Sequence, residues 1–219
     1  MLKYEASDFV VTESVADNVT AAELVLSSMR SVLFQGPIGC GKTALAHHLA
    51  HKNSKLETLV EVSIDETFDS KDLIGKYEAT NVPGAFEWTA GPLTVAAKEG
   101  RWILLEDIDL ASMDIFSGIL PLLQTGKLYV GEKDMWVEAH PEFKLLATQQ
   151  LISSGDMLHL KKHAVPHFEL WGCVVCKHPS AAEVLDIVAA RHRRVPEQFV
   201  ASIAEVVTSM KTMQHLCLR

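Results

Sequence analysis

Apolar runs alternate with helix-periodic segments through about the first 150 residues of the chain. Four leucine-rich or β-branched runs have the length of buried strands, and they cover residues 31–35, 59–64, 102–105 and 143–148. The pattern predicts a first helix over about residues 13–29, which Thr12 can cap, and a second over about residues 42–52. This alternation is typical of an α/β fold, in which helices cover a central parallel sheet.

Two shorter segments predict hairpins inserted into this rhythm. Val82-Pro83-Gly84 is a turn signal within an alternating segment, and we expect a hairpin around residues 82–93. Residues 127–130 and 135–138 alternate as strands on either side of a second turn sequence, Gly131-Glu132-Lys133-Asp134.

Beyond Pro179 the pattern changes to helices. Ser180 to Glu183 form a capping box, and Pro196 suits the first turn of a last helix that runs to about residue 213. We therefore predict a nucleotide-binding core over residues 1–160 and a small helical lid over residues 161–219.

Composition limits the partners. The formal charge of −8 argues against direct contact with nucleic acid, because phosphate backbones require clustered Lys and Arg. The first eight residues lack the pattern of a signal peptide, and no run of about 18 apolar residues is free of charge. We expect a soluble intracellular protein that does not bind a membrane.

The four cysteines are too few for a disulfide framework, which indicates a reducing compartment. One interpretation of Cys173 and Cys176, with His178 nearby, is a zinc site, although no second pair of ligands has suitable spacing. The other is that residues 171–176 form a buried strand, in which cysteine packs as a small hydrophobe.

A glycine-rich segment links the first predicted strand to the second predicted helix. It reads Gly36-Pro37-Ile38-Gly39-Cys40-Gly41-Lys42-Thr43-Ala44, which matches the P-loop pattern in the context that the motif requires. Backbone N–H groups and the helix N-terminus suit the phosphates of ATP. We expect Lys42 to reach the β and γ phosphates and Thr43 to ligate Mg²⁺. The alternative is an ordinary glycine-rich turn.

An acidic pair ends the predicted strand at residues 102–105. Carboxylates delivered by a buried strand are costly unless a metal ion or a reaction uses them. We expect Glu106 to bind Mg²⁺ and Asp107 to polarise the attacking water. In P-loop ATPases the usual order of this acidic pair is Asp then Glu. Asp107 is one methylene shorter than Glu, so its carboxylate extends less far toward the water. The alternative is a surface cluster of charge after a strand.

Two further positions bear on turnover. Gln150 lies just past the predicted strand at residues 143–148, where many P-loop ATPases carry a polar sensor residue beside the γ phosphate. The competing interpretation is an ordinary polar strand end. No arginine occurs between Arg101 and Arg191, where an arginine finger is expected, and Lys161 and Lys162 lack its planar fork. Arg191, with Arg193 and Arg194, is either a nucleotide contact from the lid or a solvated helix end.

The P-loop, the acidic strand end and the segments at 69–77, 82–88 and 143–148 together resemble the midasin family of dynein-related AAA+ ATPases. The likeness is strongest to its first ATPase module, including the Glu-Asp order, and covers roughly residues 8–150. It implies a P-loop AAA+ core with a central parallel sheet flanked by helices, two inserted hairpins and a small helical C-terminal lid.

The resemblance also implies a function. Family members remodel precursors of the large ribosomal subunit in the nucleolus and nucleoplasm, so neighbouring AAA+ modules, pre-60S particles and their assembly factors are the implied partners. The cofactors implied are ATP and Mg²⁺. The rival interpretations are a scaffold module that binds nucleotide without hydrolysing it and a self-assembling chaperone ATPase of the MoxR type.

Overall fold

The computed structural model describes residues 9–151 and 165–191, together with positions 199, 202 and 206. Its elements follow one another as a P-loop α/β fold with two inserted hairpins. In chain order they are α1 (Glu13–Ser28), β1 (Ser31–Gly36), α2 (Lys42–Lys52), η2 (Leu56–Thr58), β2 (Val60–Ser63), α3 (Ser70–Ile74), β3 (Gly75–Ala79), β4 (Phe86–Ala90), α4 (Pro92–Glu99), β5 (Trp102–Glu106), η3 (Ile108–Leu110), α5 (Met113–Thr125), β6 (Lys127–Val130), η4 (Gly131–Lys133), β7 (Met135–Glu138), β8 (Lys144–Gln150), η5 (Phe168–Leu170), β9 (Gly172–Val175) and α7 (Ala181–Arg191).

Five parallel strands form the central sheet in the order β2-β5-β8-β1-β9. All four strands predicted from apolar runs lie in it, within a residue or two of the expected ends. The strand order matters for function, because it sets the end of β1 between the ends of β8 and β9. Ligands of open parallel sheets bind beyond the carboxyl ends of the strands.

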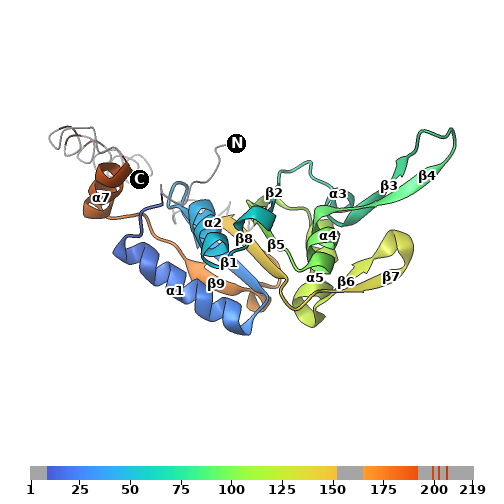
Figure 1. The fold of residues 1–219 in the computed structure, drawn as a ribbon, viewed down its shortest axis with the longest axis horizontal. Helices are drawn as coiled ribbons and strands as arrows, with labels where there is room; N and C mark the ends of the chain where they lie inside the picture. The colour runs from blue at the N-terminus through green and yellow to red at the C-terminus, as the bar shows by residue number, and fades with distance from the viewer. Residues whose placement is uncertain (1–8, 152–164, 192–198, 200–201, 203–205, 207–219) are drawn as a thin grey trace.

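Helices cover both faces of the sheet (Figure 1), and the side chains on each face form an apolar core of their own. Side chains of α1 and α2 pack on one face against alternate sheet residues such as Val32 and Phe34. Side chains of α3, α4 and α5 pack on the other face against Leu33 and its neighbours. Successive side chains of a strand point to opposite faces of the sheet, and here both faces are buried. The strands therefore appear in the sequence as continuous apolar runs.

The edge strand β9 lies within residues 161–219, the range predicted as the helical lid. It pairs in parallel with β1, from Val32 opposite Gly172 to Gln35 opposite Val175. The central sheet therefore continues past residue 160 and takes in the predicted strand at 171–176. Most of the helical residues predicted for the lid, including the helix that begins near Pro196, lie outside the described residues.

Both hairpins project from the end of the molecule opposite α7 (Figure 1). The second has the predicted bounds, but the first pairs Gly75–Ala79 with Phe86–Ala90 and so begins earlier than predicted. Val82-Pro83-Gly84 forms its tip, where Gly84 takes a φ of 81°. The predicted bounds missed the first strand because most of its residues are exposed and carry no apolar signal.

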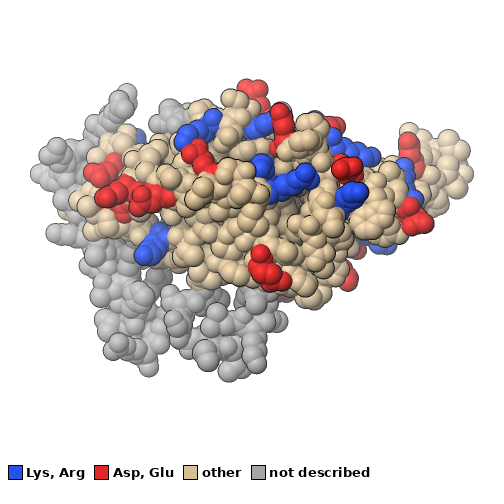
Figure 2. All heavy atoms as spheres, turned by 90° about the horizontal axis from the view of Figure 1, so that it is seen from below, with Lys and Arg blue, Asp and Glu red and all other residues tan. Residues whose placement is uncertain are grey.

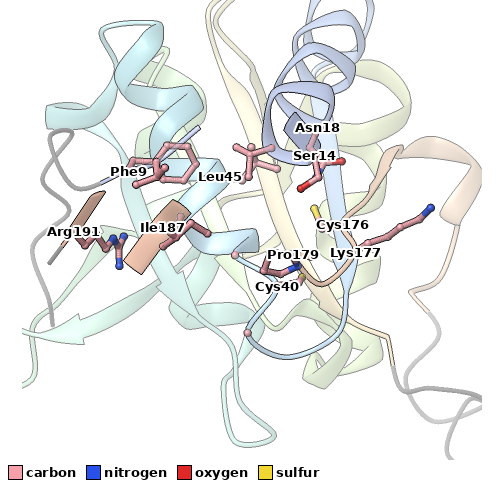
Figure 3. A pocket seen from close by; sticks show the side chains of 15 residues that line it. Phe9, Ser14, Asn18, Cys40, Leu45, Cys176, Lys177, Pro179, Ile187 and Arg191 are labelled. Carbon is pink, nitrogen blue, oxygen red and sulfur yellow. The ribbon is translucent and has the colours of Figure 1, made fainter. Parts of the chain in front are cut away.

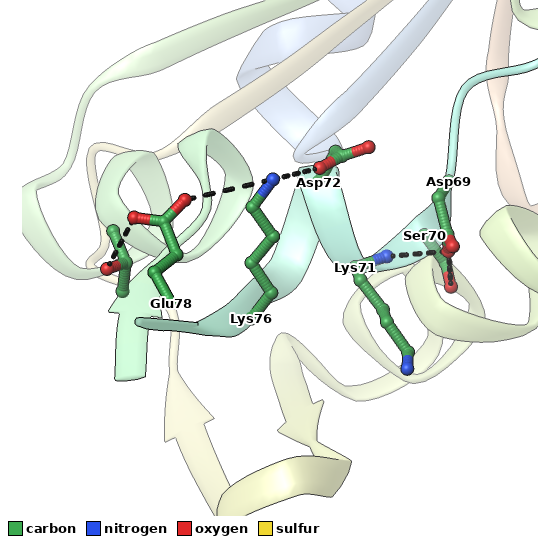
Figure 4. A network of polar contacts seen from close by, with 7 residues as sticks. Asp69, Ser70, Lys71, Asp72, Lys76 and Glu78 are labelled. Atoms are coloured by element: carbon green, nitrogen blue, oxygen red, sulfur yellow. Dashed lines mark hydrogen bonds and ion pairs between the residues drawn. The ribbon is translucent and has the colours of Figure 1, made fainter. Parts of the chain in front are cut away.

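A polar network fixes the base of the first hairpin to α3 (Figure 4). Asp69 caps α3 by accepting from the Lys71 N–H at 3.0 Å. Lys76, in β3, lies 2.7 Å from Asp72 and 3.8 Å from Glu78. The two hairpins also contact each other, since Lys133 Nζ lies 4.5 Å from the centroid of the Trp88 ring. On the face shown in Figure 2, charges of both signs are interspersed over the described surface.

One carboxylate joins the N-termini of α1 and α7. Glu183 forms the predicted capping box, accepting from the Ser180 N–H at 2.8 Å while its own N–H donates to Ser180 Oγ. Its other oxygen accepts from the Ser14 N–H at 3.0 Å. These bonds hold the pKa of Glu183 at about 2, because they favour the ionised form. Thr12 occupies the N-cap position of α1, but its side chain makes no cap hydrogen bond there, contrary to the sequence-based expectation.

We expect Glu183→Ala to lower the Tm by about 2–4 °C, because two helix N-termini lose an acceptor. A depressed carboxyl pKa contributes stability at pH values above the ordinary 4.5, and that stability is lost as the pH falls toward about 2. Calorimetry from pH 7 to pH 3 should therefore show a difference in Tm between wild type and Glu183→Ala that becomes smaller as the pH falls. The exposed Asp186, also in α7, supplies the control Asp186→Asn. An equal Tm for Glu183→Ala and wild type at pH 7 would contradict the link.

Candidate functional site

The glycine-rich loop lies between β1 and α2, at the carboxyl edge of the sheet. Gly39 and Gly41 take φ values of 77° and 93°, which few residues other than glycine adopt. The Lys42 ammonium donates to the carbonyls of Gly36 and Pro37 at 2.9 and 3.0 Å, so the lysine folds back over its own loop. The loop thus presents backbone N–H groups, a helix N-terminus and one ammonium, which are the groups that bind phosphates.

Thr43 and Glu106 meet at the start of α2. The Thr43 hydroxyl donates to Glu106 Oε1 at 2.6 Å, and Ser63 donates to the other carboxylate oxygen at 3.3 Å. β2 and β5 bring Ser63 and Glu106 together, because these residues are in register. A hydroxyl and a carboxylate are hard oxygen ligands of the kind that Mg²⁺ prefers. The pair predicted to hold the metal is therefore in contact, with a geometry that fits it.

Asp107 follows directly and takes a left-handed backbone conformation with a φ of 54°. Its N–H donates to Thr148 Oγ1 at 3.0 Å, which fixes the turn at the end of β5 to β8. Burial raises the pKa of Asp107, and the negative charges of Asp109 and Glu106 raise it further. Lys42 acts in the opposite direction. Asp107 is thus a carboxylate beside the P-loop with raised proton affinity, a property suited to a general base.

Gln150 is the last residue of β8 and lies in register with Gly36. Its N–H donates to Asp109 Oδ1 at 3.2 Å. The neighbouring Gln149 is buried instead, and its carbonyl oxygen accepts from the Gln35 amide at 2.7 Å. The structure therefore brings the predicted sensor to the edge of the P-loop. Thr148, Asp109 and Ser63 support the site. Asp109 and Thr148 lie in segments that the sequence had marked, but the sequence assigned no role to any of the three.

A pocket of about 240 Å³ opens beside the loop (Figure 3). Its lining comes from three parts of the chain: α1 with the residues just before it, the P-loop with α2, and the segment from Cys176 into α7. Phe9, Leu45 and Ile187 give it apolar walls, and Ser14 and Asn18 add polar groups. An apolar pocket with a few polar groups, next to a phosphate loop, is suited to a nucleoside.

Arg191 lies on the wall of this pocket, although its side chain is exposed overall. Of the two interpretations of the basic run, the position of Arg191 favours a contact with bound nucleotide. Arg193 and Arg194, like Lys161 and Lys162, lie outside the described residues.

Cys173 and Cys176 belong to different cores. Cys173 packs against the face covered by α3, α4 and α5, whereas Cys176 is buried on the face covered by α1 and α2. Side chains on opposite faces of a sheet cannot ligate one ion, so this pair does not form the zinc site considered from the sequence. Cys176 fits the other interpretation, a cysteine buried as a small hydrophobe.

The sequence of residues 31–166 matches the family model described as the AAA domain of the dynein-related subfamily. The chain belongs to the dynein-related AAA family. The range that matches begins at β1 and includes the P-loop, both hairpins and the acidic end of β5. AAA+ proteins in general are ATPases that bind nucleotide, usually with Mg²⁺.

Curated relatives within this AAA family include two midasins. The chain is 32% identical to midasin of Dictyostelium discoideum over 184 residues, 84% of this chain. It is 38% identical to midasin of Giardia intestinalis over 132 residues, 60% of this chain. It is also 30% identical to protein CbbQ of Hydrogenophilus thermoluteolus over 160 residues, which are 71% of this chain and 57% of that protein.

The chain spans only 3% of the length of either midasin. The similarity thus supports the expected resemblance to one AAA module of midasin. Within the part of the chain that the structure describes, no helix has both the length and the apolarity to cross a membrane.

Proposed function

We propose that this chain binds Mg²⁺·ATP at the P-loop and hydrolyses it, as one AAA+ module of midasin type. The observation that carries the proposal is the 2.6 Å hydrogen bond between Thr43 and Glu106, because it joins the loop hydroxyl and the strand carboxylate. In the proposed complex these two residues hold Mg²⁺, which neutralises charge on the transferring phosphoryl group. Lys42 binds the β and γ phosphates, and the loop from Gly36 to Ala44 supplies the backbone donors.

Asp107 is the proposed base. Its carboxylate lies beside Glu106 and Lys42, and its raised pKa favours acceptance of a proton from the attacking water. Gln150 is the proposed sensor, since its backbone is held by Asp109 at the edge of the loop. The pocket beyond the loop takes the nucleoside, and Arg191 contacts the nucleotide from the lid. We propose that residues 1–160 form the core and residues 161–219 the lid. Within the lid range, β9 adds a strand to the core sheet.

For the cellular role, we propose remodelling and nuclear export of pre-60S ribosomal particles, in the nucleolus and nucleoplasm. The similarity to midasins supports this role. Neighbouring AAA+ modules and assembly factors are the proposed partners, with no direct contact to nucleic acid. A role of MoxR type has support from the similarity to CbbQ.

A second candidate is a scaffold module that binds ATP without turnover. It is favoured by Asp107, whose side chain is one methylene shorter than the Glu usual at that position. The absence of arginine between Arg101 and Arg191 also favours it, because a cation supplied to the transition state accounts for much of the rate in this class.

Two substitutions test the roles of the acidic pair. We expect Asp107→Asn to keep Mg²⁺·ATP affinity within about twofold and to lower turnover by roughly 10²–10⁴, because the water loses its base. Glu106→Gln should instead shift the Mg²⁺ requirement to higher concentration, since a charged ligand is lost. The measurements are fluorescent-ATP titrations across a Mg²⁺ series and single-turnover phosphate release.

Asp114→Asn, an exposed position in the first turn of α5, is the charge-matched control for both variants. Identical Mg²⁺ dependence for Glu106→Gln and Asp107→Asn would show that the two roles are misassigned. Normal ATP binding with no turnover in wild type under any condition would favour the scaffold.

A further inference from the structure

Cys40 and Cys176 come together on the wall of the proposed nucleotide pocket (Figure 3). Both pack on Gly36: a Cβ added there would lie 2.8 Å from Cys40 Sγ and 2.3 Å from the Cys176 carbonyl oxygen. The Cys176 N–H donates to the Gln35 carbonyl at 2.7 Å, which fixes Cys176 beside the end of β1. The two thiols also affect each other's ionisation, because Cys176 lowers the pKa of Cys40 and Cys40 raises the pKa of Cys176.

We propose that Cys40 and Cys176 are a redox modification site, in which hydrogen peroxide or an organic peroxide converts the two thiols into a disulfide. The pair links two parts of the pocket that belong to different elements. Cys40 belongs to the loop before α2, and Cys176 begins the segment that leads to α7. The disulfide would tie the phosphate loop to the connection with the lid, and thus restrain the nucleotide site.

The surroundings give the two sulfurs different roles. Interactions with Cys176 and the nearby Lys42 lower the pKa of Cys40 to about 6, so Cys40 is mostly thiolate at neutral pH. Interaction with Cys40 and burial raise the pKa of Cys176, which keeps its proton. Burial also raises the pKa of Cys173 to about 11, and that thiol lies on the other face of the sheet. Cys40 is therefore the attacking sulfur and Cys176 the resolving one.

The reaction balances in two steps. Cys40 thiolate attacks a peroxide oxygen, so that an S–O bond forms and the O–O bond breaks; hydroxide leaves from hydrogen peroxide, and an alkoxide leaves from an organic peroxide. Cys176 then attacks the Cys40 sulfenic acid: the S–S bond forms, the S–O bond breaks, and the Cys176 proton departs with the hydroxyl as water. Two thiols are oxidised by two electrons while one peroxide is reduced. Reversible disulfides of this kind are compatible with a reducing compartment, where they act as redox sensors.

Bound ATP should slow the reaction, and this part rests on the proposed function. Phosphate next to Lys42 offsets the ammonium charge that helps to ionise Cys40, and the nucleoside fills the pocket that exposes the thiol. A weaker effect of Lys42 raises the Cys40 pKa and so lowers the fraction of thiolate, which is the reacting form. We expect oxidation to be about tenfold slower with saturating Mg²⁺·ATP.

The test is peptide mapping of the full chain after treatment with hydrogen peroxide. Trypsin leaves Cys40 on peptide 31–42 but leaves Cys173 and Cys176 together on peptide 163–177, so the mapping uses the variant Cys173→Ser, Cys217→Ser. We expect peptides 31–42 and 163–177 to be joined within one molecule and to be separated by dithiothreitol. Further replacement of Cys40 or Cys176 with Ser should abolish the link.

A Cys40 that stays reduced, or that links only to another molecule, would overturn the proposal. The effect of ATP on oxidation is measured separately, from the rate of disulfide formation with and without ATP. Binding of fluorescent ATP is measured on the same reduced protein. Equal oxidation rates with and without ATP, in a protein that binds ATP, would refute the coupling to the nucleotide site. A protein that forms the disulfide but binds no ATP would refute the proposed function and leave the redox pair standing.

Discussion

Replacement of Lys42 with alanine is expected to abolish measurable binding of Mg²⁺·ATP. The loop carbonyls of Gly36 and Pro37 already hold the ammonium over the phosphate loop, so its charge is placed before nucleotide arrives. Loss of one partner of a desolvated charge pair costs about 2–5 kcal/mol, or roughly 30-fold to several thousand-fold in affinity. The backbone N–H groups of the loop remain, but alone they offset the triphosphate charge incompletely.

A fluorescent-ATP titration measures this loss. Lys98→Ala is the matched control, because it removes the same charge from an exposed position near the end of α4, on the far face of the sheet. Lys98→Ala should bind as wild type does. Equal affinity of Lys42→Ala and wild type would remove the P-loop assignment, and with it the proposed function.

The second large effect concerns turnover in the presence of a neighbouring module. The isolated chain is expected to release phosphate very slowly, because its sequence has no arginine between Arg101 and Arg191 to serve as a finger. An arginine supplied in trans raises the rate by roughly 10³–10⁵, since it neutralises charge on the transferring phosphoryl group. Addition of the adjacent midasin-type module should therefore raise turnover steeply while the affinity for ATP changes much less.

The measurement is steady-state phosphate release at saturating ATP, first by the chain alone and then with each neighbouring module. Asp107→Asn with the same neighbour is the control, because it keeps the interface and removes the proposed base. Brisk turnover by the isolated monomer would refute the borrowed arginine. No turnover with any neighbour would instead favour the scaffold interpretation.

The sequence predicted much of the fold because its strongest signals are local. The glycines of the loop, the apolar strand before it and the helix after it are contiguous, so residues 31–52 could be interpreted as one unit. The apolar runs identified the central strands for the same reason, since strands in the middle of a parallel sheet consist mostly of apolar residues. Prediction failed where that signal was weak, as in the exposed strand β3.

The contacts that support the site could not be predicted from local sequence patterns. Asp107 is held by Thr148 and Gln150 by Asp109, in each case across 41 residues of sequence. These contacts depend on β8 lying between β5 and β1, an order that is not the order of the chain. A polar residue at a strand end gives the same signal whether it faces solvent or a neighbouring strand.

By itself, the sequence determined the P-loop, the acidic end of β5 and the α/β class, because each depends on residue types at short spacing. Only the tertiary structure decided which distant groups meet. Thr43 reaches Glu106 across 63 residues, and Ser14 reaches Glu183 across 169. Cys40 meets Cys176 because β9 returns to pair beside β1 and brings its end against Gly36. Those encounters follow from strand order and burial of two apolar cores, which are properties of the whole chain.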